Sequence, residues 1–241
     1  MIGEGFESNH LISSCQILPP TFPSQCPSSN QVASPKPARS RRVHNGGNYD
    51  SNSAYYKTCM TGLRSTQPHF DKIRIEQESG GLLKDIYRWI LDIDEFKSFL
   101  DLNSDRLFFW INGNGGMGKT MLICGIIDEL KPSTKLGTPE TSDTSLSYFF
   151  CQAAIPGLNN ATAVLKGLLF TLMLQQLGLI RNFYDDEGLE IEDWDSMAMI
   201  RDVFARVLAD PGLENTYLIV DALDECLVDS DVLLDIPGHL S

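Results

Sequence analysis

Residues 111–121, INGNGGMGKTM, decide the fold of this chain. The eight residues 113–120 match the pattern G-x-x-x-x-G-K-T in full. Glycines let a phosphate chain lie against bare backbone, whose N–H groups form an anion-binding nest. The lysine brings a positive charge to the β and γ phosphates, and the threonine hydroxyl is a ligand for Mg²⁺. The stretch predicts a nucleotide-phosphate loop formed by Gly113, Asn114, Gly115, Gly116, Met117, Gly118, Lys119, Thr120 and Met121.

The segments on either side of this loop have the periodicity that the motif requires. Residues 107–111 are apolar at nearly every position, which is typical of a strand buried on both faces of a parallel sheet. Residues 120–130 have apolar side chains on one helical face. A chance glycine-rich turn is the alternative interpretation, and the strand–loop–helix context argues against it.

Strand and helix patterns continue to alternate along the chain. Residues 145–150 and 216–220 read as short buried strands, and residues 82–90, 161–176 and 196–210 as helices. Either of two asparagines, Asn159 or Asn160, can cap the second of these helices. This alternation predicts an α/β protein with a parallel sheet.

A second acidic group follows the last predicted strand. The sequence YLIV leads into DALDEC, residues 221–226. A carboxylate at the carboxyl end of a buried parallel strand lies where the ligand crevice of an α/β sheet opens. Asp221 is therefore the candidate Mg²⁺ ligand beside Thr120, acting through water. Asp224 and Glu225 are candidate catalytic residues that polarise an attacking water. The alternative for these two is a charge pair at a helix N-terminus.

Composition restricts the classes of partner and location. The net charge of −13 argues against nucleic-acid binding, which needs a basic face. The six cysteines lack metal-binding or redox spacing, so we expect thiols in a reducing, cytoplasmic compartment. The first twenty residues have neither a basic start nor a sustained apolar stretch, so we do not expect a secretory signal. Residues 163–180 are strongly apolar but are interrupted by Lys166, Gln175 and Gln176, which favours a buried helix over a membrane span.

The predicted domain organisation has three parts. Residues 1–54 are rich in Ser, Pro, Asn and Gln and are predicted to be disordered. Their basic patch KPARSRR is either a solvated charge run or a targeting signal. Residues 55–104 form a helical lead-in, and residues 105–241 contain the N-terminal part of a phosphate-binding core.

Four segments together resemble the NACHT domain of fungal STAND NTPases: GNGGMGKTML, LSYFFCQA, NNATAVLKGLLFTLMLQQ and TYLIVDALDEC. The similarity extends over residues 59–234. It implies a three-layer P-loop NTPase that uses Mg²⁺ with ATP or GTP as a signalling switch, in fungal non-self recognition, incompatibility or programmed cell death. It also implies a NACHT homo-oligomer or full-length relatives as partners. Residues 74–76 of the lead-in are expected to pack near the base.

The sequence departs from the family in two places. Asn114, Gly115 and Met117 stand where the family's loop commonly has Asp, Pro and Lys, and we expect this to weaken nucleotide affinity. The resemblance implies the strand order 5-1-4-3-2, in which strand 4 lies beside the P-loop strand. Sixteen residues follow Glu225. We therefore expect a sheet that is incomplete at the C-terminus, a P-loop strand with neither neighbour, and a poorly soluble or partner-dependent chain.

Two functions remain open at this point. One is the nucleotide-binding switch, with slow NTPase activity if the module is complete and little or no turnover for this chain alone. The other is a truncated, non-catalytic NACHT fragment that acts by association with full-length relatives. A small GTPase is disfavoured because no N-K-x-D motif is present. The sequence does not distinguish ATP from GTP.

Overall fold

The computed structural model describes most of the chain from residue 51 onwards and one short segment before it. The described residues are 13–18, 51–64, 67–82, 84–101, 109–184, 191–213, 215–229 and 233. Predictions that concern the rest of residues 1–50, including the basic patch, lie outside the described residues.

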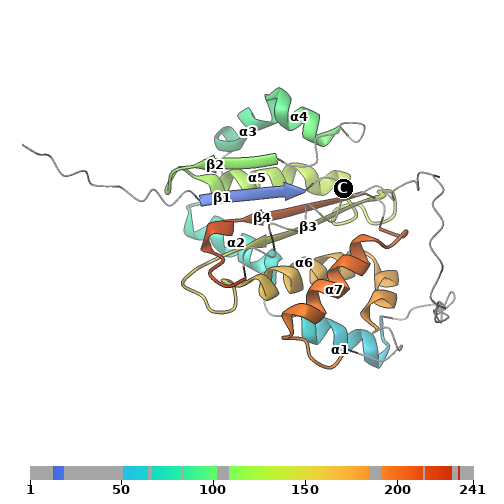
Figure 1. Ribbon diagram of the computed structural model, residues 1–241. Helices are drawn as coiled ribbons and strands as arrows, with labels where there is room; N and C mark the ends of the chain where they lie inside the picture. The colour runs from blue at the N-terminus through green and yellow to red at the C-terminus, as the bar shows by residue number, and fades with distance from the viewer. Residues whose placement is uncertain are drawn as a thin grey trace, which may run out of the picture.

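The centre of the molecule is a sheet of four strands in the order β2-β1-β4-β3 (Figure 1). The strands are β1 (Ser13–Leu18), β2 (Phe109–Gly113), β3 (Thr144–Phe150) and β4 (Asn215–Asp221). β3 and β4 pair in parallel along their whole length, whereas β1 runs antiparallel to both of its neighbours. The predicted strands at 145–150 and 216–220 are confirmed.

Seven α-helices form two layers, one on each face of this sheet (Figure 1). Their bounds are α1 (Ala54–Leu63), α2 (Pro68–Glu78), α3 (Lys84–Asp92), α4 (Asp94–Leu100), α5 (Lys119–Leu130), α6 (Ala161–Gln175) and α7 (Met197–Leu208). One core cluster joins α3, α4 and α5 to the sheet, and the other joins α1, α6 and α7 to its opposite face. Alternate residues of β3 and β4 enter the two cores, as the two-residue period of a strand requires. The three-layer α/β architecture is thus confirmed.

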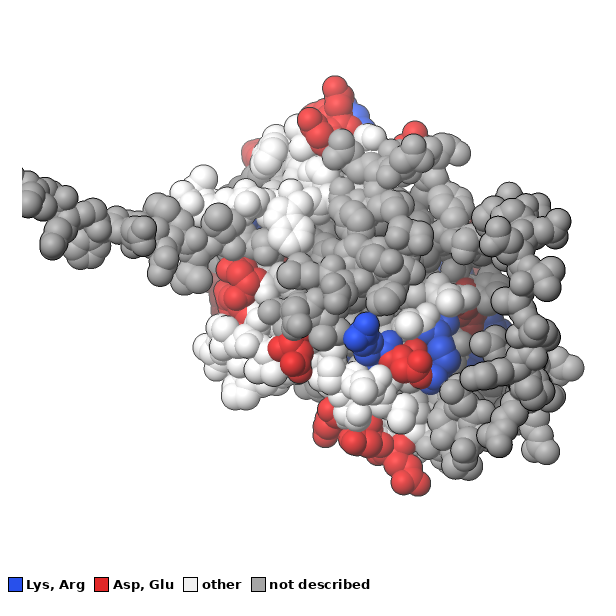
Figure 2. Space-filling view, in the orientation of Figure 1, with Lys and Arg blue, Asp and Glu red and all other residues white. Residues whose placement is uncertain are grey.

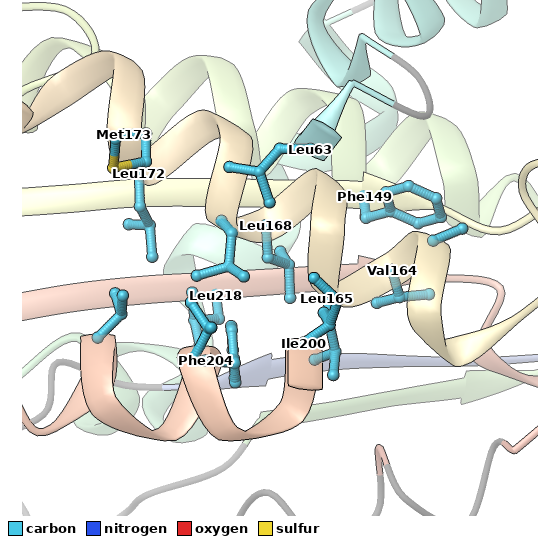
Figure 3. Packing of buried hydrophobic residues seen from close by; sticks show 14 of the residues in the cluster. Leu63, Phe149, Val164, Leu165, Leu168, Leu172, Met173, Ile200, Phe204 and Leu218 are labelled. Atoms are coloured by element: carbon cyan, nitrogen blue, oxygen red, sulfur yellow. The ribbon is translucent and has the colours of Figure 1, made fainter. Parts of the chain in front are cut away.

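The helix α6 fills the core beneath β3 and β4 (Figure 3). The Asn160 side chain caps it by accepting a hydrogen bond of 2.9 Å from the Ala163 backbone N–H. Phe204 of α7 belongs to the same buried cluster, as its place below α6 in Figure 3 shows. Lys166, the charge within the apolar run, is buried and forms a 3.0 Å ion pair with Asp195. The predicted buried helix is therefore confirmed, and its lysine has a partner.

Three glycines allow aromatic rings to lie directly against the backbone. A Cβ atom at Gly62 would collide with Trp194, one at Gly125 with Tyr87, and one at Gly167 with Phe149. In the second case the ring belongs to α3 and the glycine to α5. These contacts set how closely the helices approach their neighbours.

The lead-in differs in detail from its helical pattern. The apolar segment is divided into α3 and α4, which meet at Ile93. Trp89 is 55% exposed, although it belongs to the helical pattern of residues 82–90, whereas Tyr87 and Ile90 are buried. α5 also differs from the expected one-sided helix, because residues 121–127 are all buried. The reason is that the sheet, α2 and α3 all pack around α5.

The N-terminal segment contains the largest difference from the sequence-based expectations. Disorder is predicted for residues 1–54, yet residues 13–18 form β1. β1 lies between β2 and β4, so the P-loop strand does have a neighbour, and the expectation of two unpaired edges is wrong for one edge. An apolar strand with an open edge has unsatisfied backbone groups that any extended segment can bind, whatever its side-chain composition. Composition alone therefore does not reveal this pairing.

The surface is mixed in charge on the face seen in Figure 2. Acidic side chains lie in separate groups along its edge, and the basic side chains that are drawn gather beside acidic ones. None of the described helices has both the length and the apolarity needed to cross a membrane.

Candidate functional site

The glycine loop connects the end of β2 to the start of α5. Gly116 has φ of +77° and Gly118, the N-cap of α5, has φ of +78°. This left-handed backbone is disfavoured for residues with a Cβ atom, so glycine is needed at both positions. No side chain caps α5 at Gly118. The first N–H groups of the helix therefore remain available to an anion, together with the positive end of its dipole.

The inner side of this loop is open. A Cβ atom built on Gly115, Gly116 or Gly118 would meet no heavy atom within 4 Å. The space beside these three glycines is therefore not filled by protein atoms. Phosphate groups can approach such a bare glycine nest closely. The loop thus fits the phosphates that the sequence predicts for it.

Lys119 lies folded over this loop. Its ammonium group donates hydrogen bonds to the carbonyl oxygens of Gly113 (2.5 Å) and Asn114 (2.7 Å). The side chain is almost fully buried. The positive charge therefore stands at the mouth of the cradle, held by two neutral acceptors that an anionic phosphate can replace.

Asp221 ends β4 and is buried, with 2% of its surface exposed. Burial raises the pKa of this carboxyl group from 3.8 to about 6, against a hydrogen bond from the Thr120 hydroxyl and one from the Ala222 backbone N–H. The strongest influences on this pKa are burial, these two hydrogen bonds and the nearby carboxylates of Glu225 and Asp224, and none of them is a cation. The sequence places Thr120 and Asp221 a hundred residues apart, and the fold brings their oxygens together at one end of the sheet.

These two oxygens suit a magnesium ion. Mg²⁺ prefers hard oxygen ligands and is usually held by one or two protein groups together with substrate phosphates and water. No cluster of three or more histidine, cysteine, aspartate or glutamate side chains suited to a metal occurs within the described ranges. A site built from one hydroxyl and one carboxylate therefore fits an ion that arrives with a nucleotide.

The acidic pair follows Asp221 in a short 3-10 helix, Leu223–Glu225. Ala222 starts this turn with φ of +53°, a strained conformation for a residue with a side chain. Both Asp224 and Glu225 lie close enough to Asp221 to raise its pKa further. The carboxylate of Glu225 accepts a hydrogen bond of 2.9 Å from the Ala153 backbone N–H.

Residues that sequence analysis did not identify also shape this edge of the sheet. The loop after β3 supplies the Ala153 N–H to Glu225. The chain after Glu225 is held by two backbone bonds, Leu227 N–H to Asn159 O (2.8 Å) and Ala161 N–H to Val228 O (3.1 Å). Backbone donors in loops leave no side-chain signal, so no sequence pattern could indicate them.

The lead-in residues named from the resemblance lie on α2, which packs against α5. Glu76 forms an ion pair with Lys72, and Lys72 also lies 2.8 Å from Asp128 of α5. Arg74 pairs with acidic neighbours on its own helix, and Ile75 packs at the edge of the core. These contacts fasten α2 to the helix that follows the P-loop. Packing of residues 74–76 near a nucleotide base stays a prediction.

Comparison with known families identifies the chain. Residues 85–240 match the family described as Nephrocystin 3, N-terminal. The chain belongs to this family. The chain is also similar to the Vegetative incompatibility protein HET-E-1 of Podospora anserina, with 48% identity over 182 residues, which cover 74% of the present chain. The chain spans 13% of that protein's length. No solved structure gives a significant match.

The matched region of this nephrocystin 3 N-terminal domain begins at α3 and includes the glycine loop, β3 and the Asp221 strand. The two comparisons confirm that the chain is a protein of the fungal HET/NACHT type, as its motifs predict. HET-E-1 is named for vegetative incompatibility.

Proposed function

We propose that this chain binds a nucleoside triphosphate, ATP or GTP, together with Mg²⁺, as the switch of a NACHT-type signalling protein. The observation that supports it best is the contact between the Thr120 hydroxyl and the buried Asp221 carboxylate. It lies at the foot of an open glycine loop, beside an uncapped helix N-terminus. Each of these groups fits one part of a magnesium nucleotide.

Each residue has a definite part in this proposal. The N–H groups of residues 115–120 bind phosphate oxygens, and the Lys119 ammonium moves from the two backbone carbonyls to the β and γ phosphates. Thr120 and Asp221 hold the metal ion, which neutralises charge on the phosphates. Asp224 or Glu225 orients a water for slow hydrolysis. The exposed Met117 brings no charge to the loop, so we expect modest affinity.

The biological setting follows from the relative of known role. Because HET-E-1 is an incompatibility protein, we propose that this chain acts in fungal non-self recognition or programmed cell death. We place it in the cytoplasm, where nucleotide is abundant. The buried thiols Cys124, Cys151 and Cys226 suit that reducing compartment. Its partners would be further copies of the NACHT module or full-length relatives.

The decisive experiment is the substitution Lys119→Ala. We expect it to abolish binding of a fluorescent ATP or GTP analogue, since the ammonium group that lies over the cradle is removed. The matched control is Lys131→Ala, at the opposite end of the same helix, which should bind as the wild type does. Equal affinity in the Lys119→Ala and wild-type proteins would reject the phosphate-loop proposal. Competition with unlabelled ATP and GTP would identify the base.

One observation favours the alternative of a chain that binds nucleotide without hydrolysing it. The Glu225 carboxylate already accepts a hydrogen bond from the Ala153 N–H. To act as a general base, this oxygen would have to give up that hydrogen bond and accept one from a water molecule instead. A matched pair of phosphate-release assays, wild type against Lys119→Ala, separates the two candidates. Release that depends on Lys119 would reject the non-catalytic alternative.

A further inference from the structure

We infer that β1 is a docking strand that holds the two halves of the nucleotide site together, so that its pairing and the binding of magnesium nucleotide stabilise each other. The inference rests on the proposed nucleotide-binding function. It follows from the backbone pairing of β1 with its two neighbours in the sheet.

β1 links the strand before the glycine loop to the strand that carries Asp221. Ser13 lies opposite Gly113, the first residue of the loop. Gln16 lies opposite Val220, the residue before Asp221. β2 and β4 are not paired with each other, and each is paired with β1 (Figure 1). The distance from the loop to Asp221 is therefore set across β1.

Residues 13–15 of β1 are paired with β2 and not with β4. The pairs with β4 run from Gln16 to Leu18, whereas those with β2 begin at Ser13. β1 also contacts the 3-10 helix that carries Asp224 and Glu225. One short segment thus touches the start of the loop, the metal-binding strand and the acidic turn.

A ligand that bridges the loop and Asp221 recognises their relative position. If β1 leaves, β2 loses its described neighbour, and the position of Thr120 relative to Asp221 is no longer fixed by a hydrogen-bonded ladder. A ligand that binds only the arrangement with β1 docked shifts the equilibrium toward docking, and by linkage docking raises affinity for the ligand. Residues 19–53 connect β1 to α1, so the strand is covalently tethered to the body it pairs with.

The test compares Gln16→Pro with Gln16→Ala in the full chain. A central strand bonds to both neighbours through its backbone, and proline removes one N–H donor, whereas alanine removes the same side chain and keeps the donor. Hydrogen exchange should show protected amides at 13–18 in the wild type, and stronger protection with magnesium ATP or GTP. Gln16→Pro should lose that protection and weaken nucleotide binding by about tenfold or more, and Gln16→Ala should match the wild type.

Two results would overturn the inference. One is wild-type affinity in Gln16→Pro, which rejects the coupling and leaves the nucleotide-binding proposal intact. The other is unprotected exchange at residues 13–18 in the wild type. A wild type that binds no nucleotide would reject both proposals together, and is distinguished from the first result by the wild-type titration itself.

A cross-linked variant keeps the test sharp if Gln16→Pro fails to fold. Gln16 and Trp110 are directly opposite in the ladder, so cysteines at both positions share one face of the sheet and lie within disulfide range. The double variant Gln16→Cys/Trp110→Cys should cross-link within one chain and bind nucleotide at least as tightly as the wild type. The single variant Trp110→Cys is its control, because native Cys15 is paired with Ile111 instead. A link between two chains, or loss of binding on cross-linking, would overturn the inference.

Discussion

Two aspartates of this protein are buried to nearly the same degree, and their surroundings are opposite. Asp210 is 5% exposed and accepts hydrogen bonds from the Arg181 guanidinium, the Asn182 amide and the Gly212 backbone N–H. Asp221 is 2% exposed and is met by one hydroxyl, one backbone N–H and two further carboxylates. Burial would raise the pKa of both groups. At Asp210 these three donor groups outweigh burial and the pKa is lowered, whereas at Asp221 the pKa rises to about 6.

The difference separates a structural carboxylate from one that is built for a ligand. A buried charge is tolerated when the protein itself supplies a counter-charge and hydrogen bonds. Asp210 has both, and it joins the segment after α6 to the end of α7. The strongest influences on Asp221 include no such counter-charge, and its raised pKa means that the ionised form is costly in the ligand-free protein. Three changes test this contrast, in order of expected effect.

The largest effect is expected for Asp210→Ala. It removes the acceptor of charged and neutral hydrogen bonds at a buried site, and should lower the free energy of unfolding by about 3 kcal/mol. Urea denaturation at neutral pH measures it. The control is Asp202→Ala, which removes an exposed carboxylate that pairs with Arg206 one helical turn away and should change stability by no more than about 0.5 kcal/mol. A loss below about 1 kcal/mol for Asp210→Ala would show that this carboxylate is not a structural anchor.

A smaller effect of opposite sign is expected for Asp221→Asn in the ligand-free protein. A pKa raised from 3.8 to about 6 corresponds to at most about 3 kcal/mol of destabilisation when the group is ionised. The amide keeps the shape but needs partners for its own donors, so we expect a gain of about 1–2 kcal/mol near pH 8. A loss of stability at that pH would contradict the contrast.

The pH dependence of these two variants sharpens the contrast. The folded-state pKa of Asp221 lies above the unfolded value, so its folded form retains the proton longer, and wild-type stability falls as pH rises from about 4 to about 6. The gain from Asp221→Asn should therefore vanish near pH 4. Asp210 has a lowered pKa, so its contribution is present above about pH 4 and is lost as pH falls further. Denaturation curves across this range record both.

The smallest effect is expected for Thr120→Val, which removes the one side-chain donor to Asp221. The carboxylate loses a partner, and the pKa of Asp221 should rise by about half a unit to one unit, with a stability change of about 1 kcal/mol. The titration is followed by NMR on the carboxyl carbon. Thr171→Val is the matched control, because that buried hydroxyl donates its hydrogen bond to Gly167 O within its own helix, α6. An unchanged titration in Thr120→Val would remove the hydroxyl from the site.

Much of the candidate site was predictable because each of its parts is a short, continuous stretch of sequence. The glycine loop, its flanking strand and helix, and Asp221 at the end of β4 each have a periodic or motif signal, and the sheet brings them to one edge. The environment of Asp210 carries no such signal, since Arg181 lies 29 residues away, in the 3-10 helix Leu177–Phe183. The hydrogen bond between Glu225 and the Ala153 N–H escaped prediction because its donor is backbone.

The fold was predictable to a similar extent and failed for similar reasons. β3, β4, α6 and α7 follow their hydrophobic periods, and the Asn160 cap is where the sequence places it. α5 was misjudged because helices from distant parts of the chain surround it. β1 was missed because it joins through backbone pairing with two strands that lie a hundred and two hundred residues further on.

The aromatic rings that lie against glycine backbone have a mechanical consequence. The ring of Tyr87 occupies the space that a side chain at Gly125 would fill. We therefore expect α3 to slide along α5 only if this ring first moves away from the α5 backbone. Any movement of the helix behind the glycine loop is then passed to α3 as a rigid displacement. We therefore expect a displacement of α5 at the nucleotide site to carry α3, on the outer side of this layer, along with it.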